Sequence, residues 1–397
     1  CVVHIIRGSG RRTARKSIGS HLPPRIERGF SLSSNAIGGM RLIELPSIDE
    51  AEGCIQCQMG SKLVLFVTGH CHWMCDYCPL SENRREIDFM YANERRVDIG
   101  DWGAIIEEGR AMNATGTGIT GGDPMMAAER SMEACRELKR AFGPNHHIHL
   151  YTSIPFKPEV AEQLADAGLD EIRFHLLNLD YDRYVETMQA CRDAGIYVGI
   201  ELPCEPDQEE RLHELIEEMR NGPALFLNLN ELEITVGNYD NMEVRGFNLS
   251  SEITAGAEGS GKLARALHAK VTPDYGFMVK YCTASYKDSG QLRRRFLRRG
   301  EHTISPHEQM TEDGTMVFGA IWCSDEDAKD WSAEIQSQTG IPEQFIFHDE
   351  TLGRLEIPLT LAEEIADVID APVAMVEIHP THERLEVGVV WLNDLRP

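Results

Sequence analysis

From residue 62 onward, short apolar runs alternate with stretches of helical length, and this rhythm constrains the fold more than any other feature. The apolar runs are KLVLFVTG (62–69), TGTGITGGD (115–123), HIHLYTS (147–153), EIRFHLL (171–177), YVGIELP (197–203) and LFLNLNELEITV (225–236). The stretches between them predict helices over 101–112, 124–142, 158–167, 181–194 and 208–220. Strands that alternate with helices form βαβ units with a parallel sheet, so we expect an α/β fold.

Six such units are too few for the usual eight-stranded closed barrel but enough for a partial one with an open mouth. The pattern by itself leaves the choice between a curved sheet and an open, doubly wound sheet undecided. A further strand, YGFMVKYC (275–282), and a basic helix over 287–299 follow the sixth unit. We therefore assign residues 62–299 to the main domain.

Beyond residue 300 the pattern changes to strands at TMVFGAIW (315–322), EQFIFHD (343–349), PVAMVEIH (372–379) and RLEVGVVWL (384–392). Helices are predicted over 325–339 and 360–370. This order is typical of a compact α+β unit, and we expect residues 300–397 to form a small accessory domain.

Residues 1–39 differ in composition from the remainder, with seven basic residues against one acid, and the first methionine is Met40. An arginine- and serine-rich leader with few acids is typical of a transit peptide. A nucleic-acid-binding arm is a second interpretation. We favour a third, an extension that is disordered or outside the folded protein, and treat residues 40–61 as a separate N-terminal segment.

The formal charge of the whole chain is −25, which argues against a protein that mainly grips a nucleic-acid backbone. No apolar run approaches the roughly 18 residues of a membrane span, so we expect no membrane partner. Five of the eleven cysteines fall between residues 54 and 78. Without a clear secretory signal we expect a cytoplasmic location, where clustered thiols indicate metal binding.

The segment GHCHWMCDYCPL (69–80) carries the densest of these thiols, Cys71, Cys75 and Cys78. Three cysteines in eight residues cannot pair among themselves. Thiolates are natural ligands of zinc and of iron–sulfur clusters, but a structural zinc normally has four protein ligands. A cubane cluster held by three cysteines leaves one iron free to bind another molecule.

The spacing Cys71-x3-Cys75-x2-Cys78, directly after the first strand of a βα array, resembles the signature of the radical S-adenosylmethionine (SAM) superfamily. The resemblance covers about residues 60–285 and implies a partial (β/α)6 barrel. It implies a [4Fe–4S] cluster on the three cysteines, whose open iron binds SAM. Reductive cleavage of SAM would then give a 5'-deoxyadenosyl radical that abstracts hydrogen from an unidentified substrate, with an electron donor such as ferredoxin or flavodoxin.

The resemblance also implies SAM-binding residues, namely Tyr77, Thr120, Gly121, Gly122, Asp123, Ser153 and Glu201. Tyr77 stands where the family places an aromatic ring against adenine. TGGDP (120–124) has Asp123 where the family usually has Glu, so we expect backbone contacts from the glycine turn. Ser153 and Glu201 end strands where polar groups meet the ribose or carboxylate, although either could be a structural strand-end residue.

Within the superfamily the chain resembles an archaeal group related to pyruvate formate-lyase activating enzymes. The stretches CPLSENRR, NLNELEI and YCTASYKDSGQLRRR carry this resemblance. The domain after residue 300 departs from the activating enzymes, which argues against a glycyl-radical enzyme as the substrate. A macromolecule, either RNA or a protein, and a small metabolite are the substrates left open. A non-catalytic iron–sulfur or zinc protein in electron transfer or binding is the alternative, but such a protein has no use for TGGDP.

Cys54 and Cys57 lie just upstream of the first strand at a spacing that could hold half of an auxiliary iron–sulfur cluster or zinc site. Cys204 and Cys282, each at the end of a strand, are the candidates for its other ligands. A redox-active pair or free thiols are the alternatives. The remaining cysteines of the domains are expected to be structural.

Two further segments invite a binding interpretation. GAEGSGKL (256–263) nearly matches a phosphate-binding loop, but Leu263 replaces the Ser or Thr that holds magnesium, so we expect a glycine-rich loop before a helix. QLRRRFLRRG (291–300) places Arg293–Arg299 on one helix, which could bind phosphate, RNA or an acidic protein. The alternative for this helix is a solvated face that neutralises nearby acids.

Overall fold

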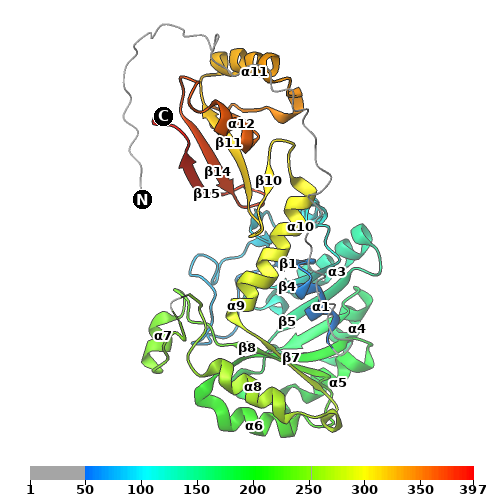
Figure 1. Ribbon diagram of the computed structural model, residues 1–397. Coiled ribbons are helices and arrows are strands. Elements are labelled where there is room, and N and C mark those ends of the chain that lie inside the picture. The colour runs from blue at the N-terminus through cyan, green and yellow to red at the C-terminus, as the bar shows by residue number, and fades with distance from the viewer. Residues whose placement is uncertain (1–49, 252) are drawn as a thin grey trace.

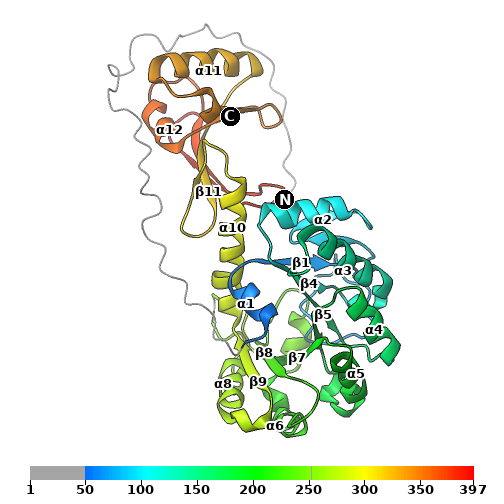
Figure 2. The same ribbon diagram turned by 90° about the vertical axis from the view of Figure 1, so that its right-hand side faces the viewer.

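A computed structural model describes residues 50–251 and 253–397, and Figures 1 and 2 show its two units. The larger unit contains a nine-stranded sheet and the smaller a six-stranded sheet. The smaller unit lies at one end of helix α10 (Arg293–Thr303) in both views. The expectations for the leader 1–39 and for residues 40–49 lie outside the described residues.

The larger sheet has the strand order β3-β2-β1-β4-β5-β6-β7-β8-β9. Its strands are β1 (Lys62–Phe66), β2 (Met90–Ala92), β3 (Arg95–Val97), β4 (Gly116–Thr120), β5 (His147–Thr152), β6 (Glu171–Phe174), β7 (Tyr197–Cys204), β8 (Phe226–Glu231) and β9 (Met278–Cys282). Strands β1 and β4 to β9 are all parallel, which confirms the predicted parallel sheet. The run at 275–282 is its seventh parallel strand, and the antiparallel β2–β3 hairpin beside β1 was not predicted.

The parallel strands alternate between apolar and polar side chains. In β5, Ile148 and Leu150 are buried in the main core beneath the helices, whereas His147, His149 and Tyr151 face the other way. Because successive side chains of a strand point to opposite faces, the inner face of the sheet is polar and the outer face is apolar. The arrangement is consistent with a partial barrel that has its helices outside.

The outer helices are α2 (Trp102–Ala111), α3 (Ala128–Phe142), α4 (Pro158–Asp166), α5 (Asp182–Asp193), α6 (Glu209–Glu218) and α8 (Ser260–Lys270). Short helix α7 (Tyr239–Val244) follows β8 and was not predicted. Helix α1 (Glu52–Gln58) lies at the N-terminal end of the strands, where Gly53 N donates to Glu171 Oε2 over 3.1 Å at the start of β6. Ala51 and Cys54 pack on Phe226 at the start of β8, so α1 closes this end of the barrel.

The smaller unit is an antiparallel sheet covered by helices on one face, which confirms the predicted α+β character. Its strands are β10 (Gln309–Met310), β11 (Met316–Trp322), β12 (Phe347–Asp349), β13 (Arg354–Ile357), β14 (Val373–Ile378) and β15 (Glu386–Trp391). Helices α11 (Asp325–Thr339) and α12 (Leu359–Ile365) bury Ile321, Ile357 and Leu361 against the sheet. Among the described residues no helix combines the length and apolarity needed to cross a membrane.

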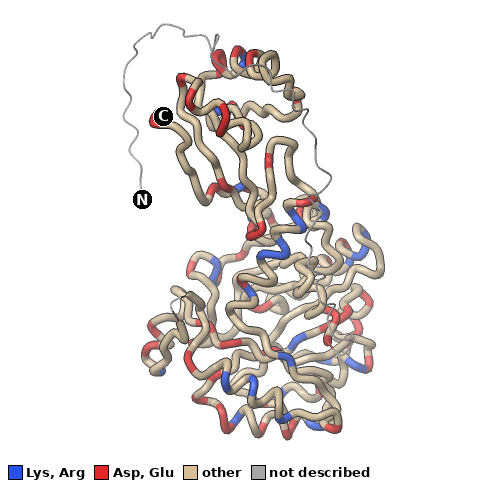
Figure 3. Tube along the Cα trace, viewed as in Figure 1, with Lys and Arg blue, Asp and Glu red and all other residues tan. Residues whose placement is uncertain are grey.

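The predicted basic helix at 287–299 consists of a π-helical segment (Lys287–Leu292) and the start of α10, and a short helix α9 (Ala284–Tyr286) precedes it. Figure 3 shows basic residues recurring along α10. Their guanidinium groups donate to Glu312 O, Gln58 O, Asn93 Oδ1, Asn113 O and Glu108. The five arginines therefore link α10 to neighbouring elements, but only Arg299 is buried and Arg293 is exposed, so the binding of phosphate, RNA or an acidic protein by this helix stays a prediction.

Candidate functional site

The three clustered cysteines lie on a loop, residues 70–86, that leaves β1 and returns to the same point. Gly69 N donates to Ile87 O and Glu86 N donates to Gly69 O, both over 2.9 Å. A side chain at position 69 would lie 1.9 Å from Arg84 O, so only glycine allows the two ends to meet. We call residues 70–86 the cysteine loop; its closed base fixes where the thiols stand.

The base of the cysteine loop is held by an ion pair beneath it. Arg130 of α3 donates to both carboxylate oxygens of Asp88, over 2.7 and 3.0 Å, and Thr68 Oγ1 also donates to Asp88. The hydrogen bonds from Arg130 lower the pKa of Asp88 to about 2. Further along, Asn238 donates to Tyr77 O over 2.9 Å and Asn241 donates to Asp76 O. Segments from three parts of the chain thus restrain the loop.

The glycine turn that follows β4 packs directly against the start of the cysteine loop. Gly122 N donates to Thr68 O and Asp123 N donates to His70 O, both over 2.8 Å. A side chain at Gly121 would lie 2.4 Å from Thr68 O, and one at Gly122 would lie 2.3 Å from His70 O. The glycines are required here by the close approach of two backbones, which sets the position of the loop.

The carboxylate of Asp123 is 2% exposed and saturated by hydrogen bonds. It accepts from Met125 N over 3.0 Å and from Thr152 Oγ1, Ser153 N and Ser153 Oγ over 2.8 Å each. The side chain therefore caps the turn after β4 and ties it to the end of β5. Two of the residues expected to meet SAM, Asp123 and Ser153, are bonded to each other.

One cavity of about 510 Å³ lies at the C-terminal ends of the parallel strands and extends into the barrel. Of the predicted site residues, Cys57, Cys71, Cys75, Tyr77, Cys78, Thr120, Gly122, Asp123, Ser153 and Glu201 line it. Gly121, Cys54, Cys204 and Cys282 are not among its lining residues. The cysteine loop, the glycine turn and two strand ends thus contribute to a single space, which we call the site cavity.

The three thiols of the cysteine loop suit a cluster better than a single ion. Cys71, Cys75 and Cys78 are free and line the same cavity, but no three metal-binding side chains of the described residues converge on one point. A zinc ion needs its thiolates at roughly 2.3 Å from one centre, whereas a cubane binds each thiolate to a different iron. Burial raises the pKa of Cys71 and raises that of Cys75 to about 11, so metal binding must displace their protons.

His175, at the end of β6, contacts Tyr77 of the cysteine loop and was not predicted. Burial raises the pKa of Tyr77, so its hydroxyl stays protonated and can donate to His175 Nε2 at 2.8 Å. His175 Nδ1 then donates to Glu201 O at 3.3 Å. These two hydrogen bonds orient the Tyr77 ring of the cysteine loop against the inner face of the barrel. The alternation of EIRFH, with every second residue polar, is the sequence signal that could have found His175.

Glu201, expected to bind ribose, is held by polar side chains of neighbouring strands. Arg173 of β6 donates to Glu201 Oε2 over 2.6 Å, and Asn230 of β8 donates to Glu201 Oε1 over 2.8 Å. Burial is the largest influence and opposes ionisation, but the charge of Arg173 and the hydrogen bonds from Asn228, Asn230 and Arg173 together keep the pKa of Glu201 below its usual value. Arg173 also donates to Glu171, so one guanidinium spans the barrel floor.

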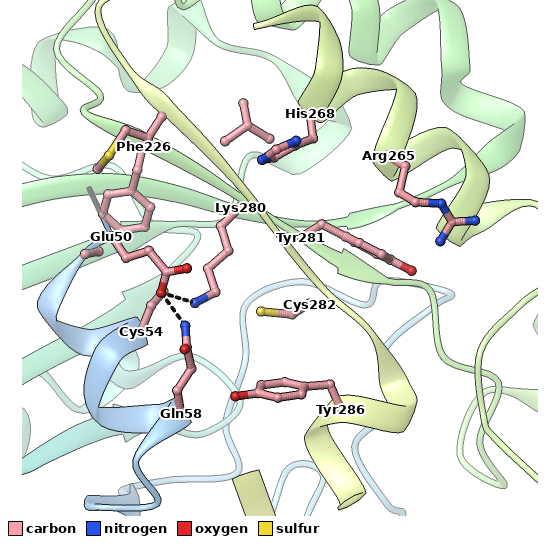
Figure 4. A pocket seen from close by; sticks show the side chains of 13 residues that line it. Glu50, Cys54, Gln58, Phe226, Arg265, His268, Lys280, Tyr281, Cys282 and Tyr286 are labelled. Atoms are coloured by element: carbon pink, nitrogen blue, oxygen red, sulfur yellow. Dashed lines mark hydrogen bonds and ion pairs between the residues drawn. The ribbon is translucent and has the colours of Figure 1, made fainter. Parts of the chain in front are cut away.

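The four thiols considered for an auxiliary metal lie in different surroundings. Cys57 lines the site cavity, whereas Cys54 and Cys282 line a second cavity of about 570 Å³, where Lys280 reaches from β9 to Glu50 (Figure 4). Cys282 donates to Asn228 Oδ1, and buried Cys204 ends β7 elsewhere. Burial raises the pKa of Cys54 and of Cys204 to about 12. These four side chains, as placed, do not fit one metal centre.

The radical SAM superfamily model matches residues 65–219 of the chain. "Putative glycyl-radical enzyme activating enzyme MJ0021" of Methanocaldococcus jannaschii is 34% identical over 361 residues, which cover 85% of this chain and 91% of that protein. GTP 3',8-cyclase of Lactiplantibacillus plantarum is 29% identical over 120 residues, 30% of this chain and 34% of that enzyme.

Among solved structures, Streptococcus suis SuiB bound to S-adenosylmethionine matches with a TM-score of 0.38 and 16% identity. The match covers 56% of this chain and 50% of SuiB, so the chain spans about half the length of that protein. Methylornithine synthase (PylB) gives a TM-score of 0.38 at 10% identity, over 58% of this chain and 78% of that one.

Proposed function

The chain belongs to the radical SAM superfamily, and on that premise we propose that Cys71, Cys75 and Cys78 hold a [4Fe–4S] cluster that binds SAM. The observation that carries the proposal is the site cavity. It brings the three free thiols of the cysteine loop together with Tyr77, Thr120 and the glycine turn. A carrier of electrons alone needs the thiols but not a cavity that extends into a barrel.

The protein itself would bind and orient the cluster and SAM and would enclose the site cavity around them. Cys71, Cys75 and Cys78 would hold the cluster in the site cavity, where the cluster together with SAM would supply the radical chemistry for hydrogen abstraction from the substrate. The closed base of the cysteine loop fixes the thiolates, and the glycine turn fixes the loop. Tyr77 is oriented by His175, and α1 closes the far end of the barrel against water. Ser153, which follows β5, and Glu201, inside β7, line the space that SAM would occupy.

The substrate that we propose is a protein. The M. jannaschii relative, whose name describes a glycyl-radical enzyme activating enzyme, aligns with 85% of this chain. An RNA substrate has less support, because the α10 arginines donate to groups of the fold. The reductant would be a low-potential carrier of the ferredoxin or flavodoxin class. A second metal is left out of the proposal, because Cys54 and Cys282 line one cavity, Cys57 lines the other and Cys204 lines neither.

The proposal is tested by anaerobic reconstitution with iron and sulfide, followed by iron counting and electron paramagnetic resonance with and without SAM. We expect about four irons per chain, a signal that changes when SAM is added, and formation of 5'-deoxyadenosine after reduction. Single Cys→Ala changes at 71, 75 or 78 should each abolish the signal. The matched control is Cys135→Ala, which removes a buried thiol of α3 outside the cavity and should keep the cluster.

Two results would overturn the proposal. Retention of the full iron content in all three variants would show that the loop is not the ligand set. A cluster whose signal is indifferent to SAM would favour the alternative, a non-catalytic iron–sulfur protein.

A further inference from the structure

Lys62 is a buried cation on the floor of the site cavity, and the mechanism above does not use it. It begins β1, is 4% exposed and lines the cavity. Its Nζ lies 3.0 Å from His147 Nδ1 and forms no ion pair with any carboxylate of residues 50–251 and 253–397. His147 Nε2 lies 3.4 Å from Glu171 Oε2, so the ring proton is on Nε2. The unprotonated Nδ1 therefore accepts a hydrogen bond from Lys62 Nζ. An ammonium has three N–H donors, and this contact uses one of them.

His149, two residues along β5 from His147, supplies a second donor in the same region. Arg173 Nη1 donates to Tyr151 Oη at 3.4 Å, and the Tyr151 hydroxyl lies 3.1 Å from His149 Nε2. In this series of hydrogen bonds, the Tyr151 hydroxyl accepts from Arg173 and donates to His149 Nε2. The neutral imidazole of His149 then carries its own proton on Nδ1. His149 is 1% exposed, lines the cavity, and its Nδ1 has no partner within the described part of the chain.

Burial and neighbouring charge agree with this assignment of protons. Burial first, and then the charges of Lys62 and Arg173, hold the pKa of His149 well below its usual value, so the ring is neutral. Burial also lowers the pKa of Lys62 to about 8, which leaves the ammonium charged at neutral pH. The floor thus presents N–H donors of two side chains without acceptors, and each unpaired buried donor costs about 1–3 kcal/mol.

The floor also lies too deep for SAM held at the cysteine loop. Lys62 is four residues, roughly 13 Å, below the end of β1. Helix α1 closes the barrel beneath it, where Gly53 bonds to Glu171 and Cys57 lines the cavity. A ligand must therefore enter from the cysteine loop and stop at the floor. This geometry admits a small molecule or the end of a chain and excludes a segment that threads through.

We propose that Lys62 and His149 form the subsite for an oxyanion, a carboxylate or phosphate group, at the leading end of the substrate. Two donors, one of them charged, favour an anion over a neutral or cationic group, and the unpaired acceptor near Gly116, the amide oxygen Gln56 Oε1, carries no net charge that would repel it. The inference rests on the proposed function in taking the site cavity as the substrate site. The oxyanion could belong to a free small molecule or to a carboxyl group at the end or tip of a peptide.

The test is isothermal titration of the reconstituted protein, under anaerobic conditions, with inorganic phosphate, acetate and glutarate. A second arm compares a glycine tripeptide with a free carboxyl terminus and the same tripeptide with an amide. We expect at least one oxyanion probe to bind, and Lys62→Met to weaken it at least tenfold. His149→Phe keeps a ring without the donor and should weaken it severalfold. Binding of the free acid but not the amide would assign the oxyanion to a peptide, and binding of the small anions alone would assign it to a small molecule.

Lys270→Met is the matched control. Lys270 of α8 does not line the cavity and pairs with Glu217, so its removal should change the affinity less than twofold. Absence of binding by wild-type protein, or equal affinity of wild type and both floor variants, would overturn the subsite. Because these titrations do not require SAM cleavage, a failure here is distinguishable from a failure of the cluster assignment.

Discussion

Ser153 donates two hydrogen bonds to the same carboxylate oxygen of Asp123, one from its backbone N and one from Oγ, each 2.8 Å long. Thr152 donates to the other oxygen over 2.8 Å. The end of β5 is thereby fastened to the turn after β4, on which the cysteine loop rests. Asp123 therefore supports the glycine turn through its hydrogen bonds to Met125, Thr152 and Ser153.

Replacing Asp123 should therefore damage folding before it damages any ligand contact. Asp123→Ala leaves buried donors of Met125, Thr152 and Ser153 without an acceptor, and we expect a loss of about 3 kcal/mol in the free energy of unfolding. Urea denaturation of the metal-free protein measures it. Glu162→Ala, an exposed change on α4, should alter the stability by less than about 0.5 kcal/mol. Equal stability of the two variants would contradict this role of Asp123.

Gly122→Ala should displace the cysteine loop. The added methyl group would lie 2.3 Å from His70 O and 2.6 Å from Gly69 O, so the loop backbone must shift. We expect a loss of about 2 kcal/mol in stability, together with a lower iron content after reconstitution. Gly103→Ala is the control, because its methyl group meets an atom of Asp101 only at 3.4 Å on helix α2. Normal iron loading of Gly122→Ala would show that the loop tolerates the shift.

Arg299 should couple the two units of the molecule. It pairs with both oxygens of Glu108 on α2 at 3.0 Å and donates to Pro380 O in the smaller unit over 2.8 Å. Arg299→Met leaves a buried carboxylate without its cation, and we expect a loss of about 3–5 kcal/mol. Differential scanning calorimetry measures the loss and should reveal separate transitions of the two units.

Arg293→Met, which removes an exposed arginine of the same helix, should cost less than about 1 kcal/mol. The double change Glu108→Met with Arg299→Met should recover part of the lost stability, because both buried charges are then absent. A double variant as unstable as Arg299→Met alone would argue against an ion pair between these residues as the cause.

Lys62 should make stability depend on pH in the alkaline range. Its folded pKa of about 8 lies below its usual value of 10.5, so between these values the unfolded chain binds more protons than the folded one. Stability from this group therefore rises as pH increases from about 8 toward 10.5, by roughly 3 kcal/mol at most. Buried thiols titrate nearby with the opposite sign, so the measurement is the difference between wild type and Lys62→Met in urea midpoints at several pH values. A difference that does not change with pH would show that Lys62 is not perturbed.

The parallel sheet could be predicted because βαβ alternation is a local pattern that leaves few topologies. The cysteine spacing could likewise be read directly, since Cys71, Cys75 and Cys78 fall within one loop. The polar inner face of the barrel was overlooked, although the alternation in HIHLYT and EIRF carries it. Ser153 and Glu201 line the cavity, but their role as SAM contacts stays a prediction and their hydrogen-bond partners were not foreseen. Glu201 was expected at a strand end and lies inside β7, because that strand continues to Cys204.

The arginines of α10 illustrate the limit of sequence reasoning. A run of arginines forms an open cationic surface only if no acidic or carbonyl group of the fold pairs with it. The sequence does not reveal such partners, because Glu108, which pairs with Arg299, lies 191 residues away along the chain. The same holds for Lys62, whose buried position depends on the curvature of β1 against β5 and on α1 below it.

The sequence by itself determined the family, the parallel sheet and the thiols of the cysteine loop, because these depend on spacing and periodicity along the chain. Only the tertiary structure decided which polar groups meet. In the folded protein Ser153 donates to Asp123, Tyr77 forms a hydrogen bond with His175, and Lys62 and His149 hold unpaired donors at the floor of the site cavity. The physical reason is that hydrogen bonds and burial act over a few ångströms in space, between residues whose separation along the chain carries no signal.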